Sequence, residues 1–127
     1  NQKDILLRIV DGYAEISREW KKGDHIELEL PMQPRLITAN EAVKDLRGQV
    51  ALASGPVIYC FEDADNPELP TLTLQPQTPL ELSHDNDLLH GVNIIKCQSK
   101  ILAKAIPYYA VANRKESHSY KVWIPQE

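Results

Sequence analysis

The chain has 127 residues, 43% hydrophobic and 25% charged, a composition typical of one globular domain with a hydrophobic core. Its formal net charge is −4, with 18 acidic against 14 basic residues, whereas a nucleic-acid-binding surface needs a clustered excess of Lys and Arg. No apolar stretch is long enough to span a bilayer as a helix. We therefore expect neither nucleic acid nor a membrane as a partner.

An antiparallel hairpin is predicted near the amino end. Apolar and polar residues alternate over residues 13–20 and again over residues 25–30, and residues 22–24 (Lys-Gly-Asp) between them have turn chemistry. A hairpin of this kind has one face on the core and the other in water. Pro31 and Pro34 then end regular strand pairing.

The middle of the chain predicts buried strands. Residues 49–61 are mostly apolar and are broken by residues 54–56 (Ser-Gly-Pro), which indicates two short strands or one bent strand buried on both faces. The segment 40–47 fits a short helix with Asn40 as N-cap and Gly48 as its end. A turn with extended flanks fits the same residues equally well.

Short strands also dominate the carboxyl half. Residues 72–79 are predicted to be extended and to lie at a sheet edge, because they contain Pro76 and Pro79. Further strands are predicted at residues 92–97, 101–111 and 120–124, with polar loops at 63–70 and 83–90. Seven or more short strands and nine prolines predict an all-β fold: one antiparallel, jelly-roll-like β-sandwich over residues 1–127, with little or no helix.

The cysteines and histidines predict no metal site. Cys60 and Cys97 lie in apolar, strand-like runs, where a thiol behaves as a small hydrophobe. Whether they form a disulfide is left open, because the sequence does not supply the distance between their Cβ atoms. The histidines lie far apart and match no zinc motif; they are His25, His84, His90 and His118.

An acidic run at residues 62–68 is the strongest concentration of carboxylates. Such a run could bind calcium, but neither Glu68 nor Leu74 fits the EF-hand spacing counted from Asp63, so a solvated loop is the preferred interpretation. Glu62 and Asp65 could form the carboxylate pair of a glycosidase, yet pairs like this occur in any acidic domain. We therefore assign no catalytic, cofactor-binding or metal-ligating residue to this chain.

Four aromatic residues are candidates for contact with a sugar or with a neighbouring domain: Trp20, Tyr108, Tyr109 and Trp123. Rings within alternating strands serve more often in core or interdomain packing than in sugar stacking. If residues 101–111 are one strand, Tyr108 and Tyr109 point to opposite faces.

A series of short motifs runs through most of the chain, and the most specific is residues 55–60 (GPVIYC), followed by Glu62. The others are residues 12–16, 18–24, 30–32, 34–35, 47–52, 65–66, 105–110, 112–114 and 122–124. In this order, the motifs resemble the C-terminal region of glycoside hydrolase family 127, the β-L-arabinofuranosidase family. The sequence departs from the family pattern at Val111, where the family has Trp, and after Arg114, where a Gly is missing.

This resemblance implies a parent enzyme with a helical-toroid catalytic domain followed by β-sandwich domains. In the family the chemistry is zinc-assisted retaining hydrolysis, with a cysteine nucleophile, further cysteine ligands and two glutamates, all in the helical domain. Cys60 and Cys97 match none of these positions, so no cofactor is expected in this chain. By analogy with polysaccharide-degrading bacteria, we expect a periplasmic or secreted parent.

The resemblance and the residues together predict a non-catalytic, C-terminal β-sandwich domain of a larger glycoside hydrolase. Its expected partner is the catalytic domain of its own protein, or a second copy in a homodimer. The alternative is a carbohydrate-binding module that stacks sugars on exposed Tyr and Trp rings.

Overall fold

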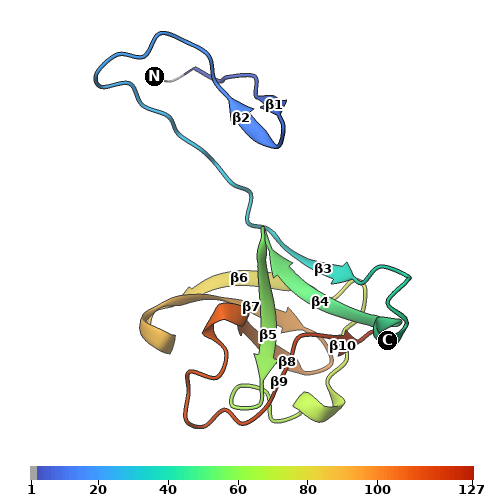
Figure 1. Ribbon diagram of the computed structural model, residues 1–127. Coiled ribbons are helices and arrows are strands. Elements are labelled where there is room, and N and C mark those ends of the chain that lie inside the picture. Colours follow the sequence, from blue (N-terminus) through green and yellow to red (C-terminus); the bar gives the residue numbers. More distant parts are fainter. Residues whose placement is uncertain (1–2) are drawn as a thin grey trace. The chain divides into compact units, whose positions relative to one another are not determined.

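The computed structural model describes residues 3–127, which group into two units, residues 3–30 and Pro31–Glu127 (Figure 1). The regular elements of these residues are short strands and single 3₁₀ turns, so the predicted all-β fold with little helix is confirmed. None of their helices is long and apolar enough to cross a membrane. The division differs from the predicted single sandwich over residues 1–127, because only the unit from Pro31 onward supplies strands to the larger sheet.

The smaller unit contains one hairpin, but not the predicted one. Strand β1 (Arg8–Val10) pairs with β2 (Tyr13–Glu15), and residues 25–30 form no strand. The turn is Asp11-Gly12, whose φ values of 50° and 83° suit a two-residue hairpin loop. Asp-Gly flanked by apolar residues is a strong hairpin signal, so the local turn determines the pairing.

The larger unit is built on one antiparallel sheet of eight strands. The path is β10-β4-β5-β8-β7-β6, with β3 also paired to β4 and β9 to β5. The strands are β3 (Pro34–Thr38), β4 (Gln49–Ser54), β5 (Val57–Glu62), β6 (Leu80–Asp85), β7 (Val92–Gln98), β8 (Leu102–Pro107), β9 (Tyr120–Lys121) and β10 (Ile124–Pro125).

This sheet curls around a hydrophobic core, so that β6 approaches β3 (Figure 1). Leu52, Phe61 and Ile95 are fully buried in that core, which is also lined by Leu36 of β3 and Leu82 of β6. The opposite face of the central strands is buried as well, under a smaller cluster. Burial on both faces explains why β5 is a continuous apolar run without alternation.

The structure decides between the predictions for three further segments. Residues 40–47 form turns and one 3₁₀ turn, η1 (Lys44–Leu46), so the turn interpretation holds. The predicted edge strand at 72–79 contributes only a single bridge, between Leu74 and Gln126. Strand β6 begins at Leu80 instead and runs into the predicted loop 83–90, because Leu80 and Leu82 face the main core.

Candidate functional site

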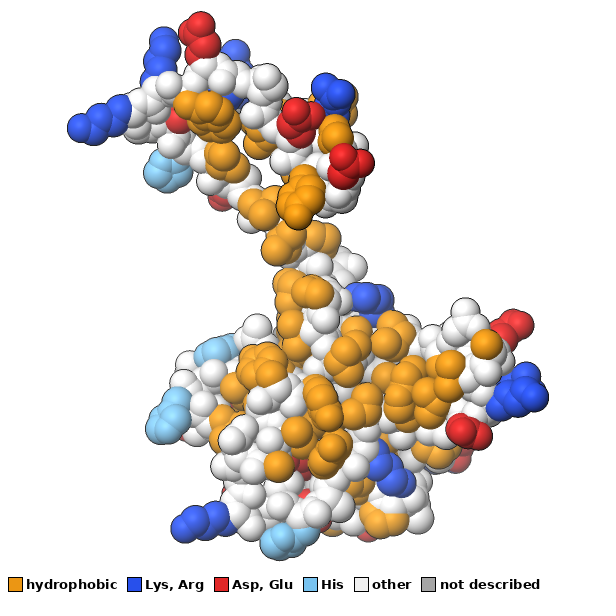
Figure 2. Space-filling view, viewed as in Figure 1, with side chains coloured by type: hydrophobic (Ala, Val, Ile, Leu, Met, Phe, Trp, Pro, Cys, Tyr) orange, Lys and Arg blue, Asp and Glu red, His pale blue; other side chains and the backbone are white. Residues whose placement is uncertain are grey.

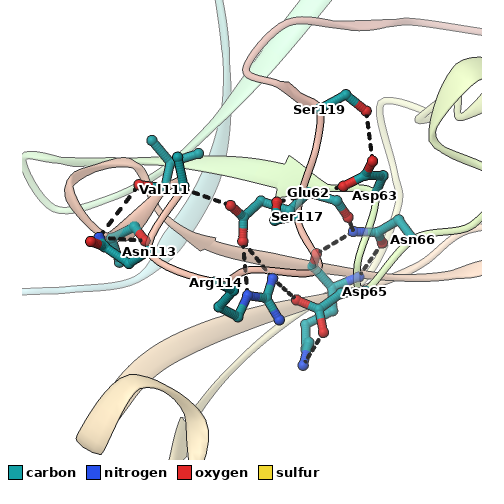
Figure 3. Close-up of polar contacts among 12 residues, drawn as sticks. Glu62, Asp63, Asp65, Asn66, Val111, Asn113, Arg114, Ser117 and Ser119 are labelled. Carbon is teal, nitrogen blue, oxygen red and sulfur yellow. Dashed lines mark hydrogen bonds and ion pairs between the residues drawn. The ribbon is translucent and has the colours of Figure 1, made fainter.

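The acidic run that follows β5 is bound to an arginine from the C-terminal loop (Figure 3). Arg114 donates from Nε (3.0 Å) and Nη2 to Oε2 of Glu62, and Nη2 also lies 2.6 Å from Oδ2 of Asp65. Lys104 of β8 contacts the other oxygen of Asp65. Two carboxylates and two cations therefore form one ion-pair network.

This network is largely removed from water. The side chain of Glu62 is 0% exposed, and those of Arg114 and Asp65 are 10% and 11% exposed. A charge in such a position is tolerated only when it is paired and hydrogen-bonded. The prediction of a solvated loop is therefore wrong at Glu62 and Asp65, because their counter-ions, Lys104 and Arg114, come from distant parts of the sequence.

The pairing fixes the protonation state of both acids. Burial alone raises the pKa of Glu62, but the N–H of Ala112 and the Arg114 guanidinium outweigh it and hold the pKa below its ordinary value. Asp65 behaves in the same way: burial opposes the charge, while Arg114 and Lys104 lower the pKa. The guanidinium lies between the two carboxylates, where a glycosidase pair would need room for a glycosidic bond.

Asp63, between these acids, anchors the far end of the same loop. Its backbone N–H donates to the carbonyl of Ser119, and its carboxylate accepts from the N–H of His118 and the hydroxyl of Ser119 (Figure 3). The first of these carboxylate bonds, from His118, contributes most to lowering the pKa of Asp63. Its oxygens are therefore held by the loop rather than left to coordinate a cation, as a calcium site would require.

Asn66 joins the acidic run to β8. Its Nδ2 donates to the carbonyls of Glu62 (2.8 Å) and Lys104 (2.9 Å), and its Oδ1 accepts the N–H of Lys104 (2.9 Å). The side chain thus makes the two hydrogen bonds with the backbone of Lys104 that a neighbouring strand would make. Asn66 is only 5% exposed, so it is also no part of a solvated loop.

Glu62 also holds a strained residue. Its Oε1 accepts the backbone N–H of Ala112 at 2.8 Å, and Ala112 has a φ of 60°. A non-glycine residue in this left-handed region persists when the surrounding contacts determine its conformation. Glu62 therefore sets the path of the chain from Ala112 into Asn113, and Val111, at the family's tryptophan position, packs on the smaller core cluster.

The four aromatic candidates are distributed over both units. Trp20 belongs to the smaller unit, is 50% exposed and carries the Arg18 guanidinium 5.1 Å from its ring centre. Tyr108 and Tyr109 are both exposed, at 45% and 72%, since the strand ends at Pro107 and continues as the 3₁₀ turn η4 (Tyr108–Ala110). The strand geometry that would direct the two rings to opposite faces is therefore absent at Tyr108 and Tyr109. Trp123 is half-buried.

The two cysteines are free and buried, and they lie in different clusters. Burial raises the pKa of Cys97 to about 12, and burial together with the Glu62 charge raises that of Cys60 to about 12. The zinc that the family resemblance implies would belong to the helical domain, and Cys60 and Cys97 lie in separate apolar clusters rather than side by side. Among residues 3–127, no three side chains of His, Cys, Asp or Glu are grouped to hold a metal.

The sequence analysis gave no role to Arg114 and Lys104 of the network, nor to the neighbouring Asn66. Only the segment 112–114, matched as part of the family pattern, pointed to Arg114. Nothing local to Asn66 indicates its bonds, because its partner Lys104 lies on another strand.

Comparisons with known proteins identify the two units separately. Residues 34–125 match the glycoside hydrolase family 127 C-terminal domain, and residues 3–32 match the β-L-arabinofuranosidase GH127 middle domain. The chain is 47% identical over 67 residues to the non-reducing end β-L-arabinofuranosidase of Bifidobacterium longum subsp. longum, a match that covers 53% of this chain and 10% of that protein.

Two solved structures have a similar fold over nearly the whole chain. Ara127N-Se, a GH127 β-L-arabinofuranosidase from Geobacillus stearothermophilus T6, has a TM-score of 0.84 at 35% identity, over 94% of this chain and 22% of that one. The GH127 β-arabinofuranosidase BT3674 has a TM-score of 0.80 at 28% identity, over 100% and 22%. This chain thus spans about a fifth of those structures. It belongs to glycoside hydrolase family 127, and its residues 34–125 form the C-terminal domain of that family.

Proposed function

We propose that this chain is a non-catalytic part of a β-L-arabinofuranosidase and that it supports a separate catalytic domain. The observation that carries the proposal is the state of Glu62 and Asp65. Both carboxylates are bound by Arg114, and both have a lowered pKa. A general acid for glycoside hydrolysis needs the opposite, a raised pKa and access to the leaving group.

The chemistry of the parent enzyme would then lie outside this chain. By family resemblance, a helical domain would hold zinc through cysteines and a glutamate, and that zinc would activate the nucleophile. The residues of this chain would bind and orient that domain without touching the reacting atoms.

The smaller unit supports a docking role. Its apolar side chains are exposed and interspersed with charged ones (Figure 2). Leu6 is 96% exposed, and Ile26, Leu28 and Leu30, at alternate positions of a segment that forms no strand, are 57%, 69% and 63% exposed. Residues 3–32 match a middle domain, so the rest of such a domain is the proposed partner for this face.

An activity assay tests the proposal. The purified chain is incubated with 4-nitrophenyl β-L-arabinofuranoside and zinc, beside a complete family 127 enzyme as positive control. We expect no release of nitrophenol from the chain. Release that disappears in Glu62→Gln or Asp65→Asn would overturn the proposal, since hydrolysis would then depend on these carboxylates.

A second experiment distinguishes docking to a middle domain from self-association of the chain. Light scattering of the chain over a range of concentrations measures whether it dimerises. If Leu28→Glu lowers the mass of a dimer to that of one chain, the exposed face pairs with a second copy instead of a middle domain, and the docking partner proposed here is wrong.

A further inference from the structure

A hollow with a volume of about 430 Å³ lies beside the C-terminal loop of the larger unit. Val92 and Ala110, both buried, form its floor. Its remaining lining residues come from two separate turns; they are Leu89, His90, Tyr109 and Asn113.

Both turns are held in strained conformations. Leu89 and His90, in the 3₁₀ turn η3 (Leu88–His90), have φ values of 51° and 65°, and Ala112, next to Asn113, has a φ of 60°. Three of the four non-glycine residues with left-handed backbone among residues 3–127 therefore border this hollow. Strained backbone of this kind is concentrated at ligand-binding sites, where it positions side chains.

Specific contacts keep these turns in place. The Asp85 carboxylate accepts the N–H groups of Asp87 and Leu88 and so fixes the start of η3. Glu62 holds Ala112. Nδ2 of Asn113 donates to the carbonyl of Ala110 at 3.0 Å, which directs the amide and leaves its oxygen as the acceptor for a ligand.

The chemistry of the lining indicates a neutral ligand. It contains an exposed phenol ring, an imidazole and an amide, but no Lys, Arg, Asp or Glu, although 25% of the chain is charged. A phosphate would need a cation here, and a metal ion would need carboxylates. An aromatic ring beside neutral hydrogen-bonding groups suits a polyhydroxylated ring, whose C–H face packs on the aromatic face.

We propose that this hollow binds one neutral sugar residue, stacked on Tyr109 and hydrogen-bonded to His90 and Asn113. The choice of an L-arabinofuranoside as that sugar rests on the proposed function. In that case the C-terminal domain binds one residue of the substrate chain.

An NMR titration of the ¹⁵N-labelled chain with methyl β-L-arabinofuranoside tests this. We expect saturable shifts of the Asn113 side-chain amide and of the backbone around Tyr109. Tyr109→Ala should weaken binding about tenfold, the size expected for loss of one ring contact. Tyr109→Phe keeps the ring and should bind as the wild type does.

Tyr13→Ala is the matched control, because Tyr13 is 78% exposed and lies on the smaller unit. It should leave the titration unchanged. Absence of saturable shifts, equal affinity of Tyr109→Ala and wild type, or shifts confined to other residues would each overturn the sugar site. A protein domain that perturbs these residues when the sugar does not would identify the hollow as a docking surface instead.

The same spectra separate this inference from the proposed function. Free arabinose appearing during the titration would contradict the non-catalytic role and leave the binding result to stand by itself. No binding and no hydrolysis would overturn only the sugar site.

Discussion

Glu62 and Arg114 lie 52 residues apart in sequence, yet Nε and Nη2 of the arginine donate to the same carboxylate oxygen. Glu62 ends the central strand β5, and Arg114 lies in the loop between η4 and β9. The pair therefore ties an irregular loop to the buried carboxyl end of a central strand. The loop forms little regular structure, since its short strand β9 contains only two residues, so side-chain contacts such as this pair and those of Asp63 attach it.

Removing Arg114 should destabilise the domain strongly. In Arg114→Ala, Glu62 remains buried with its charge unpaired, which costs about 3–5 kcal/mol in comparable buried pairs. Urea denaturation followed by circular dichroism measures this loss in the free energy of unfolding.

Arg8→Ala is the matched control for that variant. Arg8 also pairs with a glutamate, Glu15, but their side chains are 78% and 51% exposed, and exposed pairs contribute about 0–1 kcal/mol. Similar losses in the two variants would mean that burial does not set the strength of the Glu62–Arg114 pair.

Stability should fall in acid because of the same network. The folded-state pKa values of Glu62 and Asp65 lie below their ordinary values of 4.5 and 3.8. The stabilisation is therefore complete above those ordinary values and is lost as the pH falls through the lower, folded-state pKa values. Denaturation midpoints between pH 7 and pH 3 should decline below about pH 4.5.

Glu62→Gln gives the check on that pH dependence. This variant cannot titrate at position 62, so it should be less stable at pH 7 and should lose less on acidification. A decline as steep as that of the wild type would place the acid sensitivity in other carboxylates.

Asn66→Asp should destabilise the chain although it changes few atoms. Nδ2 of Asn66 donates to two carbonyls, and an aspartate oxygen would face both of them without a proton. Leaving buried groups unsatisfied costs about 1–3 kcal/mol, more with a charge. Thermal unfolding measures the effect, with Asn86→Asp at an exposed loop position as control. Equal melting temperatures for the two variants would exclude a structural role for the Asn66 bonds.

The sequence predicted what is determined locally. Strands β4 and β5, and the turn between them, follow from an apolar run broken by Gly55-Pro56, and β7 follows from another such run. The prediction of the amino-terminal hairpin was wrong because alternation alone does not determine which segments pair, whereas the Asp11-Gly12 turn does. Asp65 and Arg114 meet only after the three intervening strands β6, β7 and β8 have been placed, so an acidic run looks solvated when its counter-ions lie far along the chain.

Both thiols should be inert in the folded chain and reactive in the unfolded one. Cys60 and Cys97 are 0% exposed, and burial, with the Glu62 charge added at Cys60, raises their pKa to about 12, so almost no thiolate is present at neutral pH. A thiol reagent such as dithionitrobenzoate should then label neither cysteine until urea unfolds the domain, and labelling should follow the unfolding curve.

The variant Gln98→Cys, which adds a thiol at an exposed position beside Cys97, is the positive control and should react at once. Fast labelling of a native cysteine would mean that its strand opens locally, and peptide mapping would show whether β5 or β7 is the one that does.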